Sequence, residues 1–152
     1  MKTDLDRPEW DYRLAIRVYW EDTDAGGVVF YANYLKFFER VRTDWLRELG
    51  LSQEALRQAG QGMFVVSDVQ LRYLRSARLD DEIIVTTRLV EQGRASLVLR
   101  QQAWRGDELL TEGQVRIGWV CPVEAGGSTV TGSFRPGRIP EDILKLLPAR
   151  QS

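Results

Sequence analysis

Apolar and polar residues alternate along residues 13–20, and this alternation then gives way to a helical spacing. One side of the first segment carries Leu14, Ile16, Val18 and Trp20, which is the pattern of a half-buried strand. A polar loop, EDTDAGG, follows. Beyond it, apolar residues recur at steps of three and four at Tyr31, Tyr34, Leu35, Phe38, Val41, Trp45 and Leu49. This spacing predicts one long amphipathic helix that ends at Gly50.

The next part of the chain predicts a short helix and then a series of strands. Ser52 caps the helix, which runs through Gln58 with Glu54 in its first turn and Gly60 near its end. Beyond Gly62, four segments alternate apolar and polar residues, within 63–73, 83–89, 95–103 and 115–121. Turn residues separate the last three, so we expect four consecutive strands in an antiparallel meander.

The C-terminal segment has a different composition. Residues 122–138 are rich in Gly, Ser and Thr, which predicts a loop, and Pro140 and Glu141 then open a short helix through Leu147. The order strand, long helix, strands indicates an α+β domain, in which an antiparallel sheet of about five strands curls around one long helix. We expect a single domain over 1–152, with an N-terminal extension at 1–12 and a C-terminal loop and helix at 122–152. Uncovered edge strands favour pairing between copies.

Composition narrows the range of functions. The chain has 152 residues, of which 43% are hydrophobic and 28% charged, as in one globular domain. Lys and Arg number 21 against 22 Asp and Glu, so no positive charge excess indicates a nucleic-acid partner. No apolar run approaches the roughly 18 residues of a membrane span, and the acidic start lacks the apolar core of a signal peptide. We therefore expect a cytoplasmic protein without membrane insertion.

Histidine is absent from the chain. Its absence excludes Ser-His-Asp and Cys-His nucleophilic machinery and every His-ligated metal site. Acid-base chemistry near neutral pH then falls to carboxylates, Cys121, lysines, tyrosines, bound water or backbone groups. Cys121 cannot pair within the chain and has no basic cluster beside it, so we expect a packed thiol.

The EDTDAGG loop joins the end of a strand to the start of the long helix. Backbone N–H groups around Phe30, Tyr31 and Ala32 should lack intrahelical partners there, so they can hold an oxyanion. The positive end of the helix also favours an ionised carboxylate nearby, such as that of Asp24. An ionised carboxylate that attacks or activates water, together with donors for the thioester oxygen, is what thioester hydrolysis needs.

Three other interpretations of this loop compete with a catalytic one. It is an ordinary acidic turn if Asp22 or Asp24 makes an Asx-turn or caps a helix, which is the commoner use of such residues. The Asp-x-Asp spacing resembles a calcium loop, but the later oxygen ligands are missing because the sequence turns apolar at Val28. A phosphate-binding loop is disfavoured because no Gly-Lys-Ser/Thr or G-x-G-x-x-G pattern is present.

The segment RVYWEDTDAGGVVFYANYLKFFERVRTDWLRELG closely resembles the signature of hotdog-fold acyl-CoA thioesterases. The similarity is greatest to the bacterial Tol-Pal-associated branch and to its relative, 4-hydroxybenzoyl-CoA thioesterase, and it continues into LRYLRSARLDDEIIVTTRL. The resemblance implies a hotdog fold, an acyl-CoA substrate, no metal or redox cofactor, and sites formed between subunits of a homodimer or homotetramer. It also implies that Asp24 is catalytic, that Asp22 supports it, and that the Tyr31 backbone N–H polarises the thioester carbonyl. Many Tol-Pal-associated members carry a histidine at Tyr31.

Further residues are candidates for the site. Glu39 on the long helix is the reserve catalytic base, because other hotdog thioesterases use a helix carboxylate; the alternative is a surface pair with Arg40 or Arg42. Asn33 at the helix start either binds substrate or hydrogen-bonds locally. Three arginines near a strand end are candidates for the coenzyme A phosphates: Arg72, Arg75 and Arg78. The aromatic residues of the helix either line an acyl channel or form core: Phe37, Phe38 and Trp45.

Two rival functions remain. A hotdog hydratase or dehydratase is strongly disfavoured, because the forms known to us depend on a catalytic histidine. A hotdog module that binds acyl-CoA or a protein partner without turnover, associated with envelope or lipid-synthesis machinery, is disfavoured by the presence of both Asp22 and Asp24. We therefore expect an acyl-CoA thioesterase.

Overall fold

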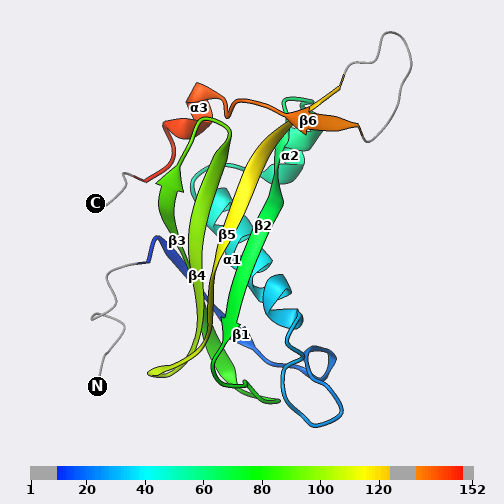
Figure 1. Cartoon of the computed structure of the whole chain (residues 1–152), viewed down its shortest axis with the longest axis vertical. Coiled ribbons are helices and arrows are strands. Elements are labelled where there is room, and N and C mark those ends of the chain that lie inside the picture. Colours follow the sequence, from blue (N-terminus) through cyan, green and yellow to red (C-terminus); the bar gives the residue numbers. More distant parts are fainter. Residues whose placement is uncertain (1–9, 124–132, 149–152) are drawn as a thin grey trace.

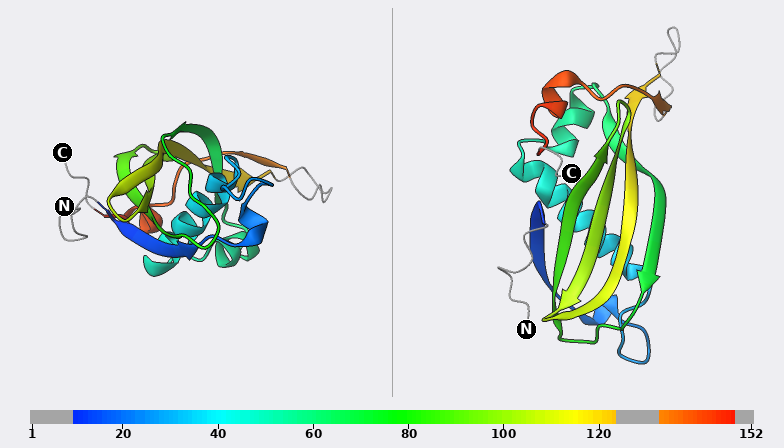
Figure 2. Two further views of the ribbon diagram at one scale, coloured as in Figure 1. Left: turned by 90° about the horizontal axis from the view of Figure 1, so that it is seen from below. Right: turned by 60° about the vertical axis from the view of Figure 1, so that its left-hand side comes forward.

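The computed structural model of the chain describes residues 10–123 and 133–148, and in it one antiparallel sheet curls around one long helix (Figures 1 and 2). The sheet has six strands: β1 (Tyr12–Arg17), β2 (Met63–Tyr73), β3 (Glu82–Gln92), β4 (Ser96–Arg105), β5 (Glu108–Pro122) and β6 (Phe134–Pro136). The helices are α1 (Asn33–Glu48), α2 (Gln53–Gln58), α3 (Glu141–Leu144) and the one-turn 3₁₀ helix η2 (Trp20–Asp22). The predicted architecture of a sheet wrapped around one long helix is confirmed.

Local signals in the sequence correctly marked the end of α1 and the bounds of α2, while α1 begins at Asn33, two residues after the first apolar position of the predicted stripe. Gly50 follows α1 with φ of +98°, a left-handed conformation that glycine adopts without strain. The Ser52 hydroxyl accepts a hydrogen bond from the Ala55 N–H at 3.3 Å and so caps α2. These two local features mark where α1 ends and where α2 begins.

The predicted four-strand meander is wrong in one strand. β3, β4 and β5 do form a meander, but β2 pairs with β5, giving the order β1-β3-β4-β5-β2. Strand β2 therefore lies at the edge of the sheet opposite β1, and residues 74–81 carry the chain back to β3. A period of two residues shows which side of a strand is buried but not which strand lies beside it, so the pattern left this pairing undetermined.

The ends of the first strand also differ from the prediction. Strand β1 stops at Arg17, and Trp20 lies in η2 with 77% of its surface exposed. At the other end, the Asp11 N–H donates to the Thr87 carbonyl at 3.0 Å, so the predicted extension over 1–12 already belongs to the sheet from Asp11 onward. The rest of that extension, residues 1–9, lies outside the described residues.

The C-terminal segment is more structured than the predicted loop over 122–138. Strand β6 pairs with the end of β5, through Val120 opposite Pro136 and Pro122 opposite Phe134. Helix α3 is shorter than expected, because it ends at Leu144 rather than Leu147. Residues 124–132 and 149–152 of the predicted tail lie outside the described residues.

The core lies between α1 and the concave face of the sheet. Phe37, Phe38 and Trp45 are fully buried there, so the helix aromatics form core rather than an acyl channel. A polar pair crosses this layer: the Arg42 guanidinium donates to the Gln101 amide oxygen at 2.9 Å, and the Gln101 NH₂ donates to the Phe38 carbonyl at 3.0 Å. Burial lowers the pKa of Arg42, and the charge of Glu39 opposes this shift.

Large apolar side chains are exposed at the start of α1 and along edge strand β2. Tyr31 and Leu35, which belong to the predicted apolar stripe, are exposed at the start of α1. Five exposed apolar residues lie on or directly after edge strand β2: Val65, Val66, Val69, Tyr73 and Leu74. Among the described residues, no strand pairs with the outer edge of β2. No helix within residues 10–123 and 133–148 combines the length and apolar character needed to cross a membrane.

Candidate active site

The EDTDAGG segment folds back on itself as a tight turn before α1. Thr23 and Val29 form an isolated antiparallel bridge, and inside it the Asp24 N–H donates to the Val28 carbonyl at 2.9 Å. The Gly27 N–H donates to the Asp24 carbonyl at 3.0 Å, and Gly27 has φ of +77°, where a side chain would cause strain. The turn brings Asp24 back toward the residues that lead into the helix.

The two carboxylate oxygens of Asp24 have different surroundings. Oδ1 accepts from the Gly26 N–H at 2.8 Å and from the Val28 N–H at 3.4 Å, which is the local Asx-type turn that the sequence offered as an alternative. Oδ2 accepts no hydrogen bond from any described residue, and the side chain is exposed. A structural role for one oxygen therefore coexists with an open position at the other.

Asp22 is buried, with 4% of its surface exposed, and it ties three segments together. Its Oδ1 accepts from the Asn33 side-chain NH₂ at 2.8 Å, and its Oδ2 accepts from the Tyr19 N–H at 2.9 Å. Its carbonyl accepts from the Phe30 N–H at 3.1 Å. Both carboxylate oxygens are thus occupied, which suits a supporting residue rather than one that reacts.

The start of α1 presents free backbone donors. The N-cap residue is Ala32, whose side chain cannot cap the helix. The Asn33 N–H donates to the Phe30 carbonyl at 2.8 Å, whereas the N–H groups of Tyr31 and Ala32 find no acceptor among the described residues. Unpaired N–H groups at the positive end of a 16-residue helix are suited to an anionic oxygen.

Residues 74–81 form a strap that holds the turn in place. Val28 forms a bridge with Arg78, the Val29 N–H donates to the Ala77 carbonyl at 2.8 Å, and the Leu79 N–H donates to the Gly27 carbonyl at 3.1 Å. The strap reaches the helix as well, because the Ala77 N–H donates to the Tyr34 hydroxyl at 3.2 Å.

An ion pair fixes the far end of this strap. The Arg105 guanidinium contacts the Asp81 carboxylate at 2.8 Å and the Glu108 carboxylate at 2.9 Å. Partial burial raises the pKa of Asp81, but the hydrogen bonds and charges of Arg105 and Arg78 outweigh burial, so the pKa lies below its usual value. The carboxylate is therefore ionised at neutral pH and holds the strap to β4.

A small pocket opens between the helix start, the end of β2 and the strap. It encloses about 160 Å³ and is lined by Val29, Tyr31, Tyr34, Tyr73, Leu74, Arg75 and Ser76. The Tyr73 ring lies 6.0 Å from that of Tyr31 and 5.8 Å from that of Tyr34, measured between centroids. Burial, with the nearby Tyr31 and Tyr34, raises the pKa of Tyr73, so its hydroxyl is protonated at neutral pH.

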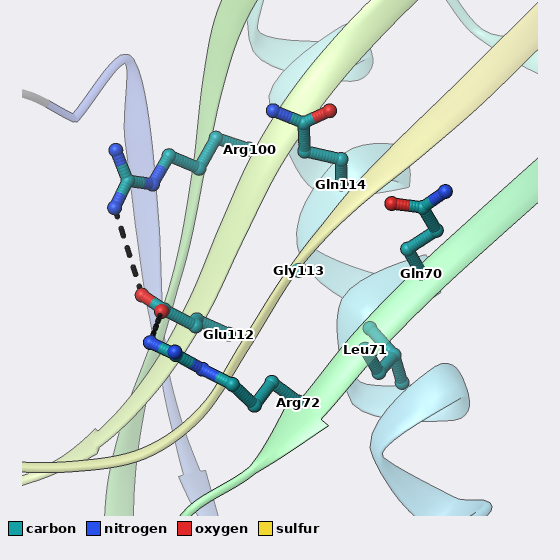
Figure 3. Close-up of a pocket in the computed structure, with 7 residues that line it drawn as sticks. All are labelled: Gln70, Leu71, Arg72, Arg100, Glu112, Gly113 and Gln114. Atoms are coloured by element: carbon teal, nitrogen blue, oxygen red, sulfur yellow. Dashed lines mark hydrogen bonds and ion pairs between the residues drawn. The ribbon is translucent and has the colours of Figure 1, made fainter.

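The three candidate arginines do not lie together. Arg75 lines the tyrosine pocket, and Arg78 is bridged to the Asp24 turn. Arg72 instead points from the opposite face of the sheet, away from α1, and pairs with Glu112, as Figure 3 shows. Arg100 contacts the same carboxylate at 3.6 Å.

The hollow around Glu112 is larger than the tyrosine pocket, at about 350 Å³. It contains neither Asp24 nor the helix start, and size alone does not make it the reaction site. Partial burial raises the pKa of Glu112, but hydrogen bonds from Arg72 and Gln102 and the charge of Arg100 bring it below the usual value. An ionised Glu112 engages the Arg72 side chain, while the Arg75 guanidinium contacts the Glu108 carboxylate at 3.5 Å.

Glu39 is exposed on α1, about 9 Å along the helix axis from Asn33. Its carboxylate accepts from the Thr43 hydroxyl at 2.7 Å. The alternative, a surface pair with Arg40 or Arg42, is not formed as an ion pair among the described residues: Arg42 turns inward to Gln101, where the charge of Glu39 still acts on it, and Arg40 lies over the Phe37 ring at 5.8 Å. Glu39 stays a prediction as reserve base.

Sequence reasoning did not single out Tyr73 or the role of Tyr34 at this site. The helical spacing placed Tyr34 on the apolar face of the helix, and its burial confirms this. Only the fold shows that its hydroxyl accepts a hydrogen bond from Ala77 in the strap. Tyr73 lay at the end of a predicted strand, and its approach to the helix start depends on β2 pairing with β5. No short-range signal could have indicated this juxtaposition.

Comparison with known proteins gives consistent matches. The family model described as "Thioesterase superfamily" matches residues 26–112. The acyl-CoA thioesterase YbgC of Haemophilus influenzae is 40% identical over 132 residues, covering 87% of this chain and 90% of that protein. A probable thioesterase from Bartonella henselae is 30% identical with a TM-score of 0.73, covering 85% of this chain and 99% of that one.

A third match concerns the fold alone. A 4-hydroxybenzoyl-CoA thioesterase mutant, solved with 4-hydroxybenzoyl-CoA, is 19% identical with a TM-score of 0.75, over 88% of this chain and 96% of that one. The hotdog fold expected from the sequence is therefore confirmed. With the turn, the strap and the helix start arranged as described, the chain belongs to the thioesterase superfamily, as one of its YbgC-type acyl-CoA thioesterases.

Proposed function

We propose that this protein hydrolyses acyl-CoA to a free acid and coenzyme A, with Asp24 as the reacting carboxylate and the Tyr31 N–H as the oxyanion donor. One juxtaposition supports the assignment. A short folded loop connects an exposed carboxylate, with one oxygen held and the other open, to a helix start with unpaired N–H groups. Thioester hydrolysis needs both groups at one carbonyl.

The reaction follows one of two routes, and both consume one water molecule and give the free acid and coenzyme A. In the first, Asp24 Oδ2 attacks the carbonyl carbon, the C–S bond breaks, and the coenzyme A thiolate leaves and takes up a proton; water then hydrolyses the mixed anhydride. In the second, Asp24 Oδ2 takes a proton from water as the water oxygen attacks the carbonyl carbon; the C–S bond then breaks, and the coenzyme A thiolate leaves and takes up a proton as Asp24 gives its proton up. In both, negative charge grows on the carbonyl oxygen, and a positioned N–H donor there typically contributes about 10²- to 10³-fold in rate.

The supporting residues have distinct proposed roles. Asp22 positions the loop, because both of its oxygens are occupied by Asn33 and Tyr19. Asn33 is buried against Asp22, so its local hydrogen bond supports positioning more strongly than direct substrate binding. Of the three candidate arginines, Arg78 is the best placed for the coenzyme A phosphates, because it is bridged to the Asp24 turn; Arg75 lines the tyrosine pocket, and Arg72 is the weaker candidate.

We also propose a homodimer, or a homotetramer built from it, that covers the outer edge of β2. Five apolar residues are exposed on or directly after this strand, and the exposed Tyr31 ring lies 6.0 Å from that of Tyr73. Clustered exposed apolar side chains of this kind favour a protein interface. The outer edge of the eleven-residue strand β2 offers backbone donors and acceptors to a second copy. Such an interface would border the tyrosine pocket, and a cytoplasmic location suits a protein whose lone Cys121 forms no disulfide.

Release of free thiol from a panel of acyl-CoA substrates tests the proposed function. Wild type should turn over at least one of them, and Asp24→Asn should lose about 10²- to 10⁴-fold in kcat while still binding acyl-CoA. Glu39→Gln is the matched control, since its carboxylate contacts only Thr43 among the described side chains. Full activity in Asp24→Asn with loss in Glu39→Gln would transfer the catalytic role to Glu39. Binding without any turnover by wild type would favour a non-catalytic module.

A further inference from the structure

The tyrosine pocket adjoins the proposed oxyanion donor through a shared residue. Tyr31 supplies both the unpaired N–H and part of the pocket lining. A thioester carbonyl that accepts from this N–H has two substituents, the acyl group and the sulfur of coenzyme A. The space between Tyr31, Tyr34 and Tyr73 is the adjoining pocket that can receive one of them.

The lining favours the acyl substituent. Val29 and Tyr34 are buried and close the inner end, while the rings of Tyr31 and Tyr73 stand at the sides, with the Tyr31 and Tyr73 planes at 85° to each other. The pantetheine arm is a long chain with two amides and needs an open groove with hydrogen-bonding partners. Five of the seven lining residues are Val29, Leu74 and the three tyrosines, with Arg75 and Ser76 as the polar members, and a compact space with three aromatic walls suits an apolar group.

The size of the pocket limits what this group can be. An engineered apolar cavity of about 150 Å³ accommodates benzene, and the tyrosine pocket encloses about 160 Å³. It therefore has room for roughly one six-membered ring or a short aliphatic chain, and not for the chain of a long fatty acid. Val29 and Tyr34 are fixed in place by hydrogen bonds to Ala77, so the inner end cannot retreat easily.

We propose that Tyr73 is a specificity-determining residue, whose ring forms the movable wall of an acyl subsite that admits only compact acyl groups. This inference rests on the proposed function. Tyr73 is the wall that can change, because it lies at the end of an edge strand with 45% of its surface exposed, whereas Tyr34 is 2% exposed. A second copy covering the edge of β2 would close the open side of the subsite rather than lengthen it.

The test compares kcat/KM for butyryl-, hexanoyl-, benzoyl-, dodecanoyl- and hexadecanoyl-CoA. Wild type should favour the first three over dodecanoyl-CoA by about tenfold or more, which is the discrimination that a misfitting methylene typically causes. Tyr73→Ala should raise the ratio of dodecanoyl to butyryl kcat/KM by a similar factor, and Tyr73→Phe should keep the wild-type ratio. Phe134→Ala, which removes a comparably exposed ring from β6, is the matched control and should change no ratio.

Binding separates failure of this inference from failure of the proposed function. Dissociation constants for 2-oxoalkyl-CoA thioethers of the same lengths, which keep the carbonyl but cannot be hydrolysed, should rise with chain length in wild type and level out in Tyr73→Ala. If wild type hydrolyses nothing, the proposed function fails, and these constants still test the subsite. Wild-type preference for hexadecanoyl-CoA, or a length profile unchanged in folded Tyr73→Ala by both measurements, overturns the proposal.

Discussion

The side chain of Asn33 donates a 2.8 Å hydrogen bond to the carboxylate of Asp22, and both side chains are almost fully buried. Asn33 is the first residue of α1 and Asp22 is the last residue of η2, so this bond joins the two sides of the loop that carries Asp24. The same carboxylate also holds the Tyr19 N–H. The proposed reacting groups, Asp24 and the Tyr31 N–H, both lie between these two anchors.

Replacement of Asn33 should therefore weaken both stability and catalysis. Asn33→Ala leaves a buried carboxylate oxygen without its donor, and we expect a loss of about 1.5–3 kcal/mol in the free energy of unfolding. Asn33→Asp places a second carboxylate against Asp22, so its loss at pH 7 should be greater and should shrink as the pH falls, because two adjoining carboxylates can then share a proton. Urea denaturation at several pH values measures both. Equal stability of the two variants across the whole pH range would contradict the account.

Substitutions at the two neighbouring glycines should separate activity from stability. A Cβ at Gly26 would lie 3.3 Å from Asp24 Oδ1, so Gly26→Ala should disturb the held oxygen and lower kcat, with a small change in stability. A Cβ at Gly27 meets nothing within 4 Å, but φ there is +77°, so Gly27→Ala should cost about 1–2 kcal/mol of stability. Thermal unfolding and thiol release on the same two variants distinguish these outcomes. A folded Gly26→Ala enzyme with wild-type kcat would argue against Asp24 Oδ1 being a positioned atom.

Lowering the pH should weaken the ion pair between Asp81 and Arg105 that holds the strap to β4. Its folded pKa lies below the ordinary value of 3.8, so ionised Asp81 stabilises the fold above that value, and this contribution disappears as the pH falls through the lower folded pKa. The free energy of unfolding should thus decline below about pH 4, and Asp81→Asn should remove part of the decline. Because the pair with Arg105 is partly exposed, the effect should be modest and should shrink in high salt. An identical pH profile for wild type and Asp81→Asn would exclude this contribution.

The buried pair of Arg42 and Gln101 should show strong coupling. Gln101→Leu removes the one acceptor that the described residues give the Arg42 guanidinium, so we expect a loss of about 1.5–3 kcal/mol. Arg42→Met leaves the Gln101 amide oxygen unpaired and should cost about 1–3 kcal/mol. The double variant should be more stable than the sum of the two losses implies, because neither group is then left alone. Additive losses in a double-mutant cycle would show that the pair is not energetically linked.

A charge on the edge of β2 should prevent self-association. Val66 is exposed on this strand, so Val66→Lys should shift the protein toward a monomer in analytical ultracentrifugation and lower its activity if sites form between subunits. Gln114→Lys, on the inner strand β5 and lining the hollow on the sheet face opposite α1, is the matched control and should leave the sedimentation coefficient unchanged. A wild-type protein that sediments as a monomer at all concentrations would remove the basis for the proposed dimer.

Short-range signals made much of the fold and the site predictable. The three- and four-residue spacing located α1, Gly50 and Ser52 marked where α1 ends and α2 begins, and the polar loop before the helix located Asp24. Each of these features depends on residues within a few positions of one another. The resemblance to hotdog thioesterases added the catalytic assignment of Asp24, which remains a prediction.

The sequence by itself determined the elements, the strand-to-helix junction and the residue types available for chemistry there, because periodicity, capping and composition are local properties. Only the tertiary structure decided that β2 joins β5, that Asn33 faces Asp22, that Arg72 points away from α1, and that Tyr73 meets the start of α1. These relationships link residues from 11 positions apart, as for Asp22 and Asn33, to 57 positions apart, as for Met63 and Val120. They depend on which strands pair and which faces pack, and no local pattern encodes that choice.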